Sequence, residues 1–190
     1  MRLTMILPSV VLAAAVSAAY VAKADDWNEK TAMTFAAPVE LPGRVLPPGT
    51  YIFKLIDSSD SAGNIVAVYN KNESHVYGIF LTVPDYRLRP SGKTIVTFAE
   101  TPAGSPDALW AWFYPGDNYG HEFVYPKSEA VRLAKANNRP VAAMPDEVAN
   151  QPATNINDSG VSAMKRAHVT AVMPNGQEVE PSTVFGSSGQ

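Results

Sequence analysis

The sequence contains no cysteine among its 190 residues. This absence excludes a disulfide scaffold, thiol catalysis, cysteine-ligated zinc and iron–sulfur clusters. Histidine is scarce, with three residues, so few side chains are available as conventional general bases. Lys and Arg number 15 against 18 Asp and Glu, and no block of basic residues occurs. The chain therefore lacks the concentrated positive charge that nucleic-acid binding requires, and no nucleic-acid partner is expected.

The beginning of the chain carries its one long apolar run. Arg2 precedes an apolar stretch of about 17 residues over positions 3–19, and an Ala-Lys-Ala cleavage site ends at Ala24. This order predicts a secretory signal peptide over residues 1–24 that is cleaved after Ala24. A membrane anchor is the alternative, but the run is marginal for spanning a bilayer. We expect a periplasmic or secreted bacterial protein with no transmembrane anchor after cleavage.

The rest of the chain has a pattern typical of strands. The whole chain is 46% hydrophobic and 17% charged, which is the composition of a globular protein. Short segments rich in Val, Ile, Thr and aromatic residues alternate with Pro, Gly, Asn and Asp. We predict a mainly β fold, either an antiparallel β-sandwich or a partly open barrel. The clearest predicted strands cover residues 31–35, 49–56, 65–70, 75–83, 94–99 and 108–114.

One α-helix is predicted, over residues 126–137. Pro126 suits a first helical turn, and Glu129 and Lys135 complement the positive and negative ends of the helix dipole. Its apolar stripe is narrow, so we expect the helix to pack on the sheet. Strands and helix together give a β domain over residues 25–138.

Beyond this domain the composition changes. Residues 139–166 contain several prolines with Asn, Asp, Gln and Ser between them, and they predict a flexible linker. Residues 167–190 contain an Asn-Gly pair between two apolar segments, which predicts a short hairpin followed by a disordered tail. The C-terminal region is therefore expected to be an extended tail.

The segment 114–126 holds the densest cluster of chemically functional residue types. Asp117, His121 and Glu122 are weak candidates for a divalent metal such as zinc or manganese, and no other cofactor is predicted. Neighbours on an extended chain point to opposite sides, so His121 and Glu122 can converge only if the chain bends at Gly120. The other interpretation is a structured turn made by Pro-Gly-Asp-Asn, in which His121 caps backbone groups.

An aromatic strand precedes that segment. Trp110, Trp112 and Tyr114 are predicted to share one face, which is either part of the core or exposed as a binding platform. Aromatic side chains beside Asp and Asn are suited to sugar or peptide recognition. The candidate ligand-binding surface comprises Trp110, Trp112, Tyr114, Asp117, Asn118, Tyr119 and His121.

Two segments carry a resemblance. Residues 46–51 read Leu-Pro-Pro-Gly-Thr-Tyr, and residues 114–123 read Tyr-Pro-Gly-Asp-Asn-Tyr-Gly-His-Glu-Phe. With their surroundings they resemble a group of small exported bacterial proteins of unknown function. The resemblance implies a location outside the cytoplasm and no particular activity.

These observations favour a non-catalytic binding or structural protein of the bacterial cell envelope. Its partner would be an unknown envelope protein or a glycan, its oligomeric state is not predicted, and no catalytic residue is assigned. One alternative is a metal-assisted hydrolase that uses Asp117, His121 and Glu122, although the sequence has no Gly-x-Ser-x-Gly or His-Glu-x-x-His motif. Another is an assembly module that donates its C-terminal hairpin to the sheet of a partner.

Overall fold

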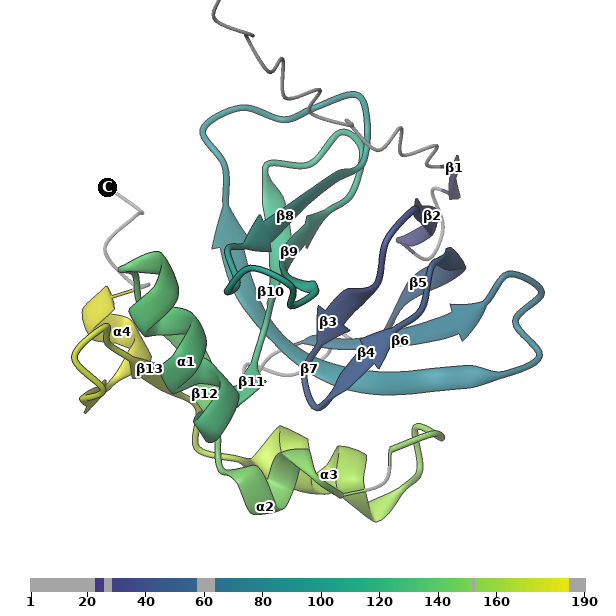
Figure 1. Cartoon of the computed structure of the whole chain (residues 1–190). Coiled ribbons are helices and arrows are strands. Elements are labelled where there is room, and N and C mark those ends of the chain that lie inside the picture. Colours follow the sequence, from purple (N-terminus) through teal and green to yellow (C-terminus); the bar gives the residue numbers. More distant parts are fainter. Residues whose placement is uncertain (1–22, 26–28, 58–63, 152, 185–190) are drawn as a thin grey trace, which may run out of the picture.

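The computed structural model describes residues 23–25, 29–57, 64–151 and 153–184. These residues form one large sheet and a smaller second sheet with helices beside it (Figure 1). The predicted mainly β class is confirmed, and the arrangement is consistent with a sandwich or partly open barrel. Most predicted strands are also found, whereas the C-terminal third is more regular than expected.

The large sheet is built from the first ten strands. They are β1 (Lys23–Asp25), β2 (Lys30–Phe35), β3 (Val39–Leu41), β4 (Arg44–Leu46), β5 (Gly49–Asp57), β6 (Asn64–Asn70), β7 (Val76–Tyr86), β8 (Ile95–Ala99), β9 (Asp107–Phe113) and β10 (Tyr119–Phe123). Their order is β1-β2-β5-β6-β7-β10-β9-β3-β4, and β8 also pairs with β9. The β3–β9 pair is parallel, and the other pairs of this sheet are antiparallel.

In the meander β5–β6–β7, the first part of the middle strand, β6, is buried on both faces. Val66 and Val68 of β6 belong to the main core, whereas Ile65 and Ala67, which alternate with them, belong to a second apolar cluster. A strand covered on both sides reads as a continuous apolar run, which explains the uninterrupted Ile-Val-Ala-Val sequence here. The second cluster is covered by the C-terminal part of the chain.

Strand β10 differs from the prediction. Residues 114–126 were expected to form a turn or metal loop, but Tyr119–Phe123 is an internal strand paired with both β7 and β9. The turn itself forms ahead of it, where the Asp117 N–H donates to the Tyr114 carbonyl over 3.3 Å and Gly116 has a φ of 93°. His121 and Glu122 therefore lie in the sheet.

The second sheet follows β10 directly. It has the order β11-β12-β13-β14 and contains β11 (Tyr125–Pro126), β12 (Val141–Met144), β13 (Thr170–Val172) and β14 (Glu178–Val179). Between β11 and β12 lies α1 (Lys127–Asn137), at the place where the helix was predicted. Polar contacts join α1 to the large sheet and its turns: Arg132 pairs with Glu40 of β3, and the Gly43 N–H donates to Glu129 over 3.1 Å. At the other end of the helix, the Asn137 side chain exchanges two hydrogen bonds with the backbone of Glu100, which follows β8.

The predicted linker over residues 139–166 is corrected by the structure. It contains β12, α2 (Asp146–Ala149) and α3 (Ser159–Arg166), and Val141, Ala142 and Val161 are all buried to within 1% exposure. Helix α3 contacts β7, and α2 contacts α3 and β11, so both helices pack on the domain rather than extending from it (Figure 1). One helix was predicted, but the described residues also contain α2, α3 and the short α4 (Pro181–Val184).

The predicted hairpin is present. Strands β13 and β14 pair antiparallel around Gly176, whose φ is 83°, so the Asn-Gly pair makes the turn as expected. The hairpin joins β12 of its own chain, which places this region in a sheet and not in an extended tail.

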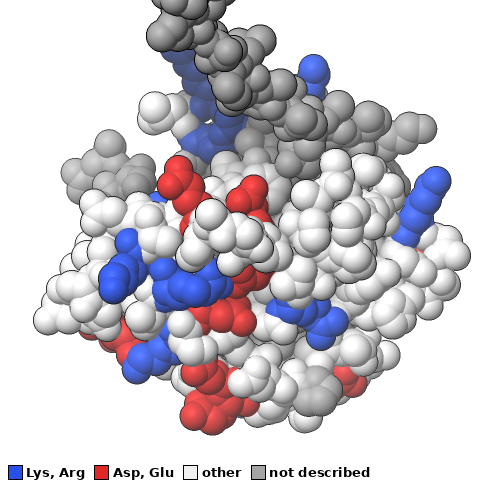
Figure 2. Space-filling model, in the orientation of Figure 1, with Lys and Arg blue, Asp and Glu red and all other residues white. Residues whose placement is uncertain are grey.

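Two predictions lie largely outside the described residues: the signal peptide over 1–24, of which only positions 23 and 24 are described, and the disordered tail, whose residues 185–190 are not described. Within the described ranges, no helix combines the length and apolar character needed to cross a membrane. Figure 2 shows acidic and basic side chains interspersed over the face that carries α1, in keeping with the Arg132–Glu40 and Lys127–Glu178 ion pairs.

Candidate functional site

The aromatic residues of the predicted surface are core residues. Trp110, Trp112 and Tyr114 are 2%, 0% and 6% exposed, so they offer no binding platform, and this part of the predicted surface is corrected. Trp112 lies in the main core, where its ring contacts those of Phe53 and His121. The core interpretation therefore applies to this strand.

A bulge changes the direction of Trp110. Thr97 pairs with Ala111 and Phe98 pairs with Leu109, so Trp110 is the extra residue of β9 between them. A bulge places two successive side chains on similar sides of the sheet. The Trp110 ring stacks under the guanidinium of Arg139, 3.6 Å from its central carbon, although it belongs to the same apolar cluster as Trp112.

His121 is held in a closed hydrogen-bond network. It is 1% exposed, its Nε2 lies 2.8 Å from a carboxylate oxygen of Glu29, and its Nδ1 lies 3.2 Å from the Asn64 amide nitrogen. The same amide nitrogen also donates to the Tyr119 hydroxyl. Both ring nitrogens are occupied, so His121 anchors Glu29 to β10 and has no nitrogen left for a metal or a substrate.

Glu122 points to the other side of β10 and has quite different neighbours. It is 3% exposed, and its Oε1 has no hydrogen-bond partner. Burial, the largest cause, and the nearby Asp85 carboxylate raise the pKa of Glu122 to about 7, against the opposing effect of Arg139. A carboxyl with this pKa near neutrality is a common feature of functional sites.

The predicted metal site is not formed. His121 and Glu122 lie on opposite sides of one strand, as neighbouring residues of an extended chain do, while Asp117 belongs to the preceding turn. No cluster of three metal-ligating side chains occurs in the described part of the chain. Asn118 is exposed and its carbonyl accepts from the Arg87 N–H over 2.7 Å, so it too has a role in the turn.

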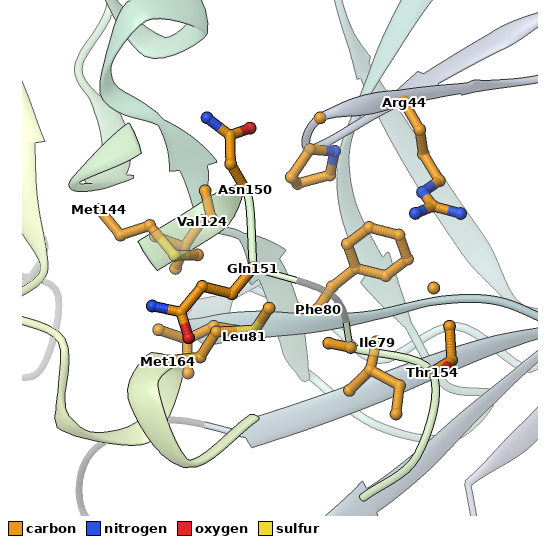
Figure 3. Close-up of a pocket in the computed structure, with 15 residues that line it drawn as sticks. Arg44, Ile79, Phe80, Leu81, Val124, Met144, Asn150, Gln151, Thr154 and Met164 are labelled. Atoms are coloured by element: carbon orange, nitrogen blue, oxygen red, sulfur yellow. The ribbon is translucent and has the colours of Figure 1, made fainter. Parts of the chain in front are cut away.

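A cavity of about 310 Å³ lies elsewhere, beside β7 (Figure 3). Its floor is apolar and includes Ile79 and Leu81 of β7, Val124, Met144 of β12 and Met164 of α3. Each of these floor residues is at most 5% exposed, so they form a buried surface. A volume near 300 Å³ is at the lower end of the range for small-molecule sites.

The rim of this cavity is polar. Asn150, Gln151 and Thr154, from the chain between α2 and α3, line one side, and Pro42 to Arg44, from the β3–β4 turn, lines the other. Among the described lining residues, Arg44 is the charged one, and it makes no ion pair with another described residue. Figure 3 shows Arg44 descending from its strand beside the Phe80 ring.

Phe80 shapes this end of the cavity because of Gly78. A Cβ added to Gly78 would lie 2.5 Å from the Phe80 ring, so the ring occupies the space that any other residue would fill. Gly78 thereby leaves room for the aromatic wall of the cavity.

Sequence reasoning missed this cavity. Its walls come from β7, from the β3–β4 turn and from the segment that was interpreted as a linker. The one available signal was the presence of Val141-Ala142-Ala143-Met144, an apolar run too long for a solvated linker.

The chain matches no family model, no curated protein and no solved structure.

Proposed function

We propose that this chain is a binding module that holds a small amphiphilic molecule in the cavity between β7 and the α2–α3 segment. The observation that carries the proposal is the cavity itself, with about 310 Å³ of space, a buried apolar floor and a polar rim. An apolar pocket with a few polar groups at one end is the usual form of a small-molecule site.

The size and charge of the cavity define the ligand class. Since a water molecule takes up about 30 Å³ in the liquid, the space suits on the order of ten non-hydrogen atoms. Met144 and Met164 are flexible and polarisable, so the floor can adapt to chains of differing shape. Arg44 favours a negative group at the rim. A medium-chain carboxylate combines these properties.

The cellular setting remains part of this proposal. The signal-peptide pattern and the resemblance to small exported bacterial proteins support a place in the cell envelope. The metal-assisted hydrolase is not favoured, because Asp117, His121 and Glu122 do not converge. Strand donation is not favoured either, because β13 already pairs with β12 of its own chain.

The proposal predicts that the protein binds octanoate and that filling the cavity abolishes binding. Ala153 is 8% exposed and lines the cavity, so Ala153→Phe places a ring in the ligand space. We expect this variant to lose at least about tenfold in octanoate affinity by isothermal titration calorimetry, because the apolar surface is no longer available. The control is Ala136→Phe on the exposed face of α1, which should bind as the parent does.

A comparison of octanoate with uncharged octanol tests the charged rim. Arg44→Gln should weaken octanoate binding about two- to fivefold, the effect of one exposed charge, and leave binding of uncharged octanol unchanged. Undiminished octanoate binding by Ala153→Phe would show that the cavity is not the site. If the parent protein binds neither octanoate nor octanol, the proposed function as a whole is contradicted.

A further inference from the structure

Glu122 lies where the large sheet meets the second sheet, and its carboxyl lies close to the indole N–H of Trp110. The Glu122 Oε1 and the Trp110 Nε1 are both buried, but this contact does not reach standard hydrogen-bond geometry, so both atoms are poorly satisfied. An unpartnered buried polar atom costs free energy, so its presence in a packed core calls for a physical reason. A carboxyl whose pKa burial raises to about 7 supplies one, because its neutral form is far less costly to bury than its charged form.

The groups around Glu122 come from each element packed on it. Asp85 of β7 is its acidic neighbour, Arg139, which follows α1, is the cation, and the Trp110 indole of β9 is a further donor. The Tyr125 hydroxyl of β11 donates to the Leu109 carbonyl instead and, with a pKa well above its ordinary value, stays neutral in this range. The Ala142 N–H of β12 donates to the carboxyl. His121 faces the opposite side of the strand and binds Glu29, so it does not contribute to this cluster.

The chain that covers Glu122 also forms a wall of the cavity. Arg139 and Ala142 lie at the start of the segment that continues to Met144, and Met144 lines the cavity. Val124, between β10 and β11, follows Glu122 by two residues and lines the cavity too. Any movement of β12 away from Glu122 therefore changes the shape of the ligand space.

We propose that Glu122 is a proton-controlled latch that keeps β12 packed on the large sheet and so regulates the ligand cavity. In the neutral form the carboxyl is buried without a charge, and β12 stays in place. In the ionised form a negative charge is trapped beside Asp85, and the covering segment loosens to let water reach it. This inference rests on the proposed function for its effect on ligand, but the movement of β12 does not depend on any ligand.

The direction of the effect follows from linkage. The pKa of Glu122 is raised from 4.5 to about 7 by burial, so the packed state binds a proton that the loosened state releases. Packing is therefore favoured at low pH and is lost as the pH rises through about 7. Octanoate stays ionised throughout this range, because ordinary carboxyl groups titrate near pH 4.

The first experiment follows the amide hydrogen exchange of β12 between pH 5.5 and 8.5, corrected for the intrinsic pH dependence of exchange. We expect protection of this strand to fall as the pH rises, and Glu122→Gln, which mimics the neutral acid, to remain protected throughout. Asp85→Asn removes a charge that raises the pKa of Glu122, so the pH at which half of the protection is lost should be lower in this variant. Arg139→Gln removes a charge that lowers the pKa of Glu122, so the same midpoint should be higher.

The exchange midpoints of Asp85→Asn and Arg139→Gln are expected to shift in opposite directions, and this difference makes the proposal specific. The proposal would be overturned if Glu122→Gln lost protection with the same pH profile as the parent. It would also be overturned if the midpoints of Asp85→Asn and Arg139→Gln shifted in the same direction. Octanoate affinity should fall roughly threefold or more from pH 6 to pH 8 in the parent and stay constant in Glu122→Gln. A parent affinity independent of pH would overturn the link to the cavity. A protein that binds neither octanoate nor octanol contradicts the proposed function, and the exchange data still decide the latch.

Discussion

At the scale of single residues, Gly120 is the position where β10 has least room for a side chain. An added Cβ would lie 2.4 Å from the Phe113 ring, and Phe113 is 2% exposed and cannot move away freely. We expect Gly120→Ala to lower the free energy of unfolding by about 1–3 kcal/mol, the usual cost of overpacking. Urea denaturation measures this change.

The control for that substitution is Gly92→Ala. A Cβ at Gly92 would meet nothing within 4 Å, and its backbone is not in the left-handed region. This variant should differ from the parent by less than about 1 kcal/mol, in the stabilising direction, because alanine restricts the unfolded chain. Equal losses in both variants would show that the Phe113 contact is not the cause.

Neighbouring residues of β10 also show how little of a residue's chemistry is local. Alternation along a strand predicts that His121 and Glu122 face opposite ways, and the structure agrees. Their environments come from Glu29, Asp85 and Arg139, which are distant in the chain. Sequence could name the two residues, but only the packing makes one a structural anchor and the other a buried acid.

At the scale of elements, α1 is attached through one narrow face. Leu133 is 0% exposed and belongs to the main core, whereas Val131 on the same helix is 37% exposed. We expect Leu133→Ala to lower the free energy of unfolding by about 2–5 kcal/mol through the cavity it leaves. Val131→Ala is the matched control, with a loss below about 1 kcal/mol.

Chemical denaturation followed by circular dichroism measures both variants of α1. A loss for Leu133→Ala no greater than that for Val131→Ala would mean that the helix is not part of the cooperative core. The apolar stripe of α1 would then not be the face through which the helix packs on the sheet.

Elements were predictable where the local pattern was strong. The β5–β6–β7 meander, α1 and the Asn-Gly hairpin all occur where sequence placed them. Strand β10 was missed because Gly, His and Glu are poor strand formers, and its pairing with β7 and β9 compensates for that. Strand β12 was missed because prolines on both sides suggested a linker, although Pro140 and Pro145 merely bound the strand.

At the scale of the whole molecule, the predicted cleavage after Ala24 can be tested directly. Expression in a bacterial host followed by mass spectrometry of the secreted or periplasmic fraction should give a protein that begins at Asp25. Cleavage after Ala24 divides β1 and leaves β2 as the end strand of the large sheet. Because β1 spans three residues at an edge, removal of its first two should leave the melting temperature within a few degrees of that of the uncleaved chain.

The control for processing changes the cleavage site. Ala24→Leu places a bulky residue where the peptidase requires a small one, so this variant should retain its leader. An unprocessed parent chain in the cytoplasm would contradict export, without bearing on the cavity or on Glu122.

The sequence by itself determined the features that depend on short-range order: the β class, the main strands, the helix and the turn types. These follow from periodicity, propensity and the special backbone requirements of Gly and Pro, all of which act over a few residues. The tertiary structure alone decided that Trp110 and Trp112 are core residues and that α3, within the predicted linker, packs against β7. It also decided that a cavity and a buried carboxyl share strand β12. Burial and electrostatics depend on which distant segments meet, and no local pattern carries that information.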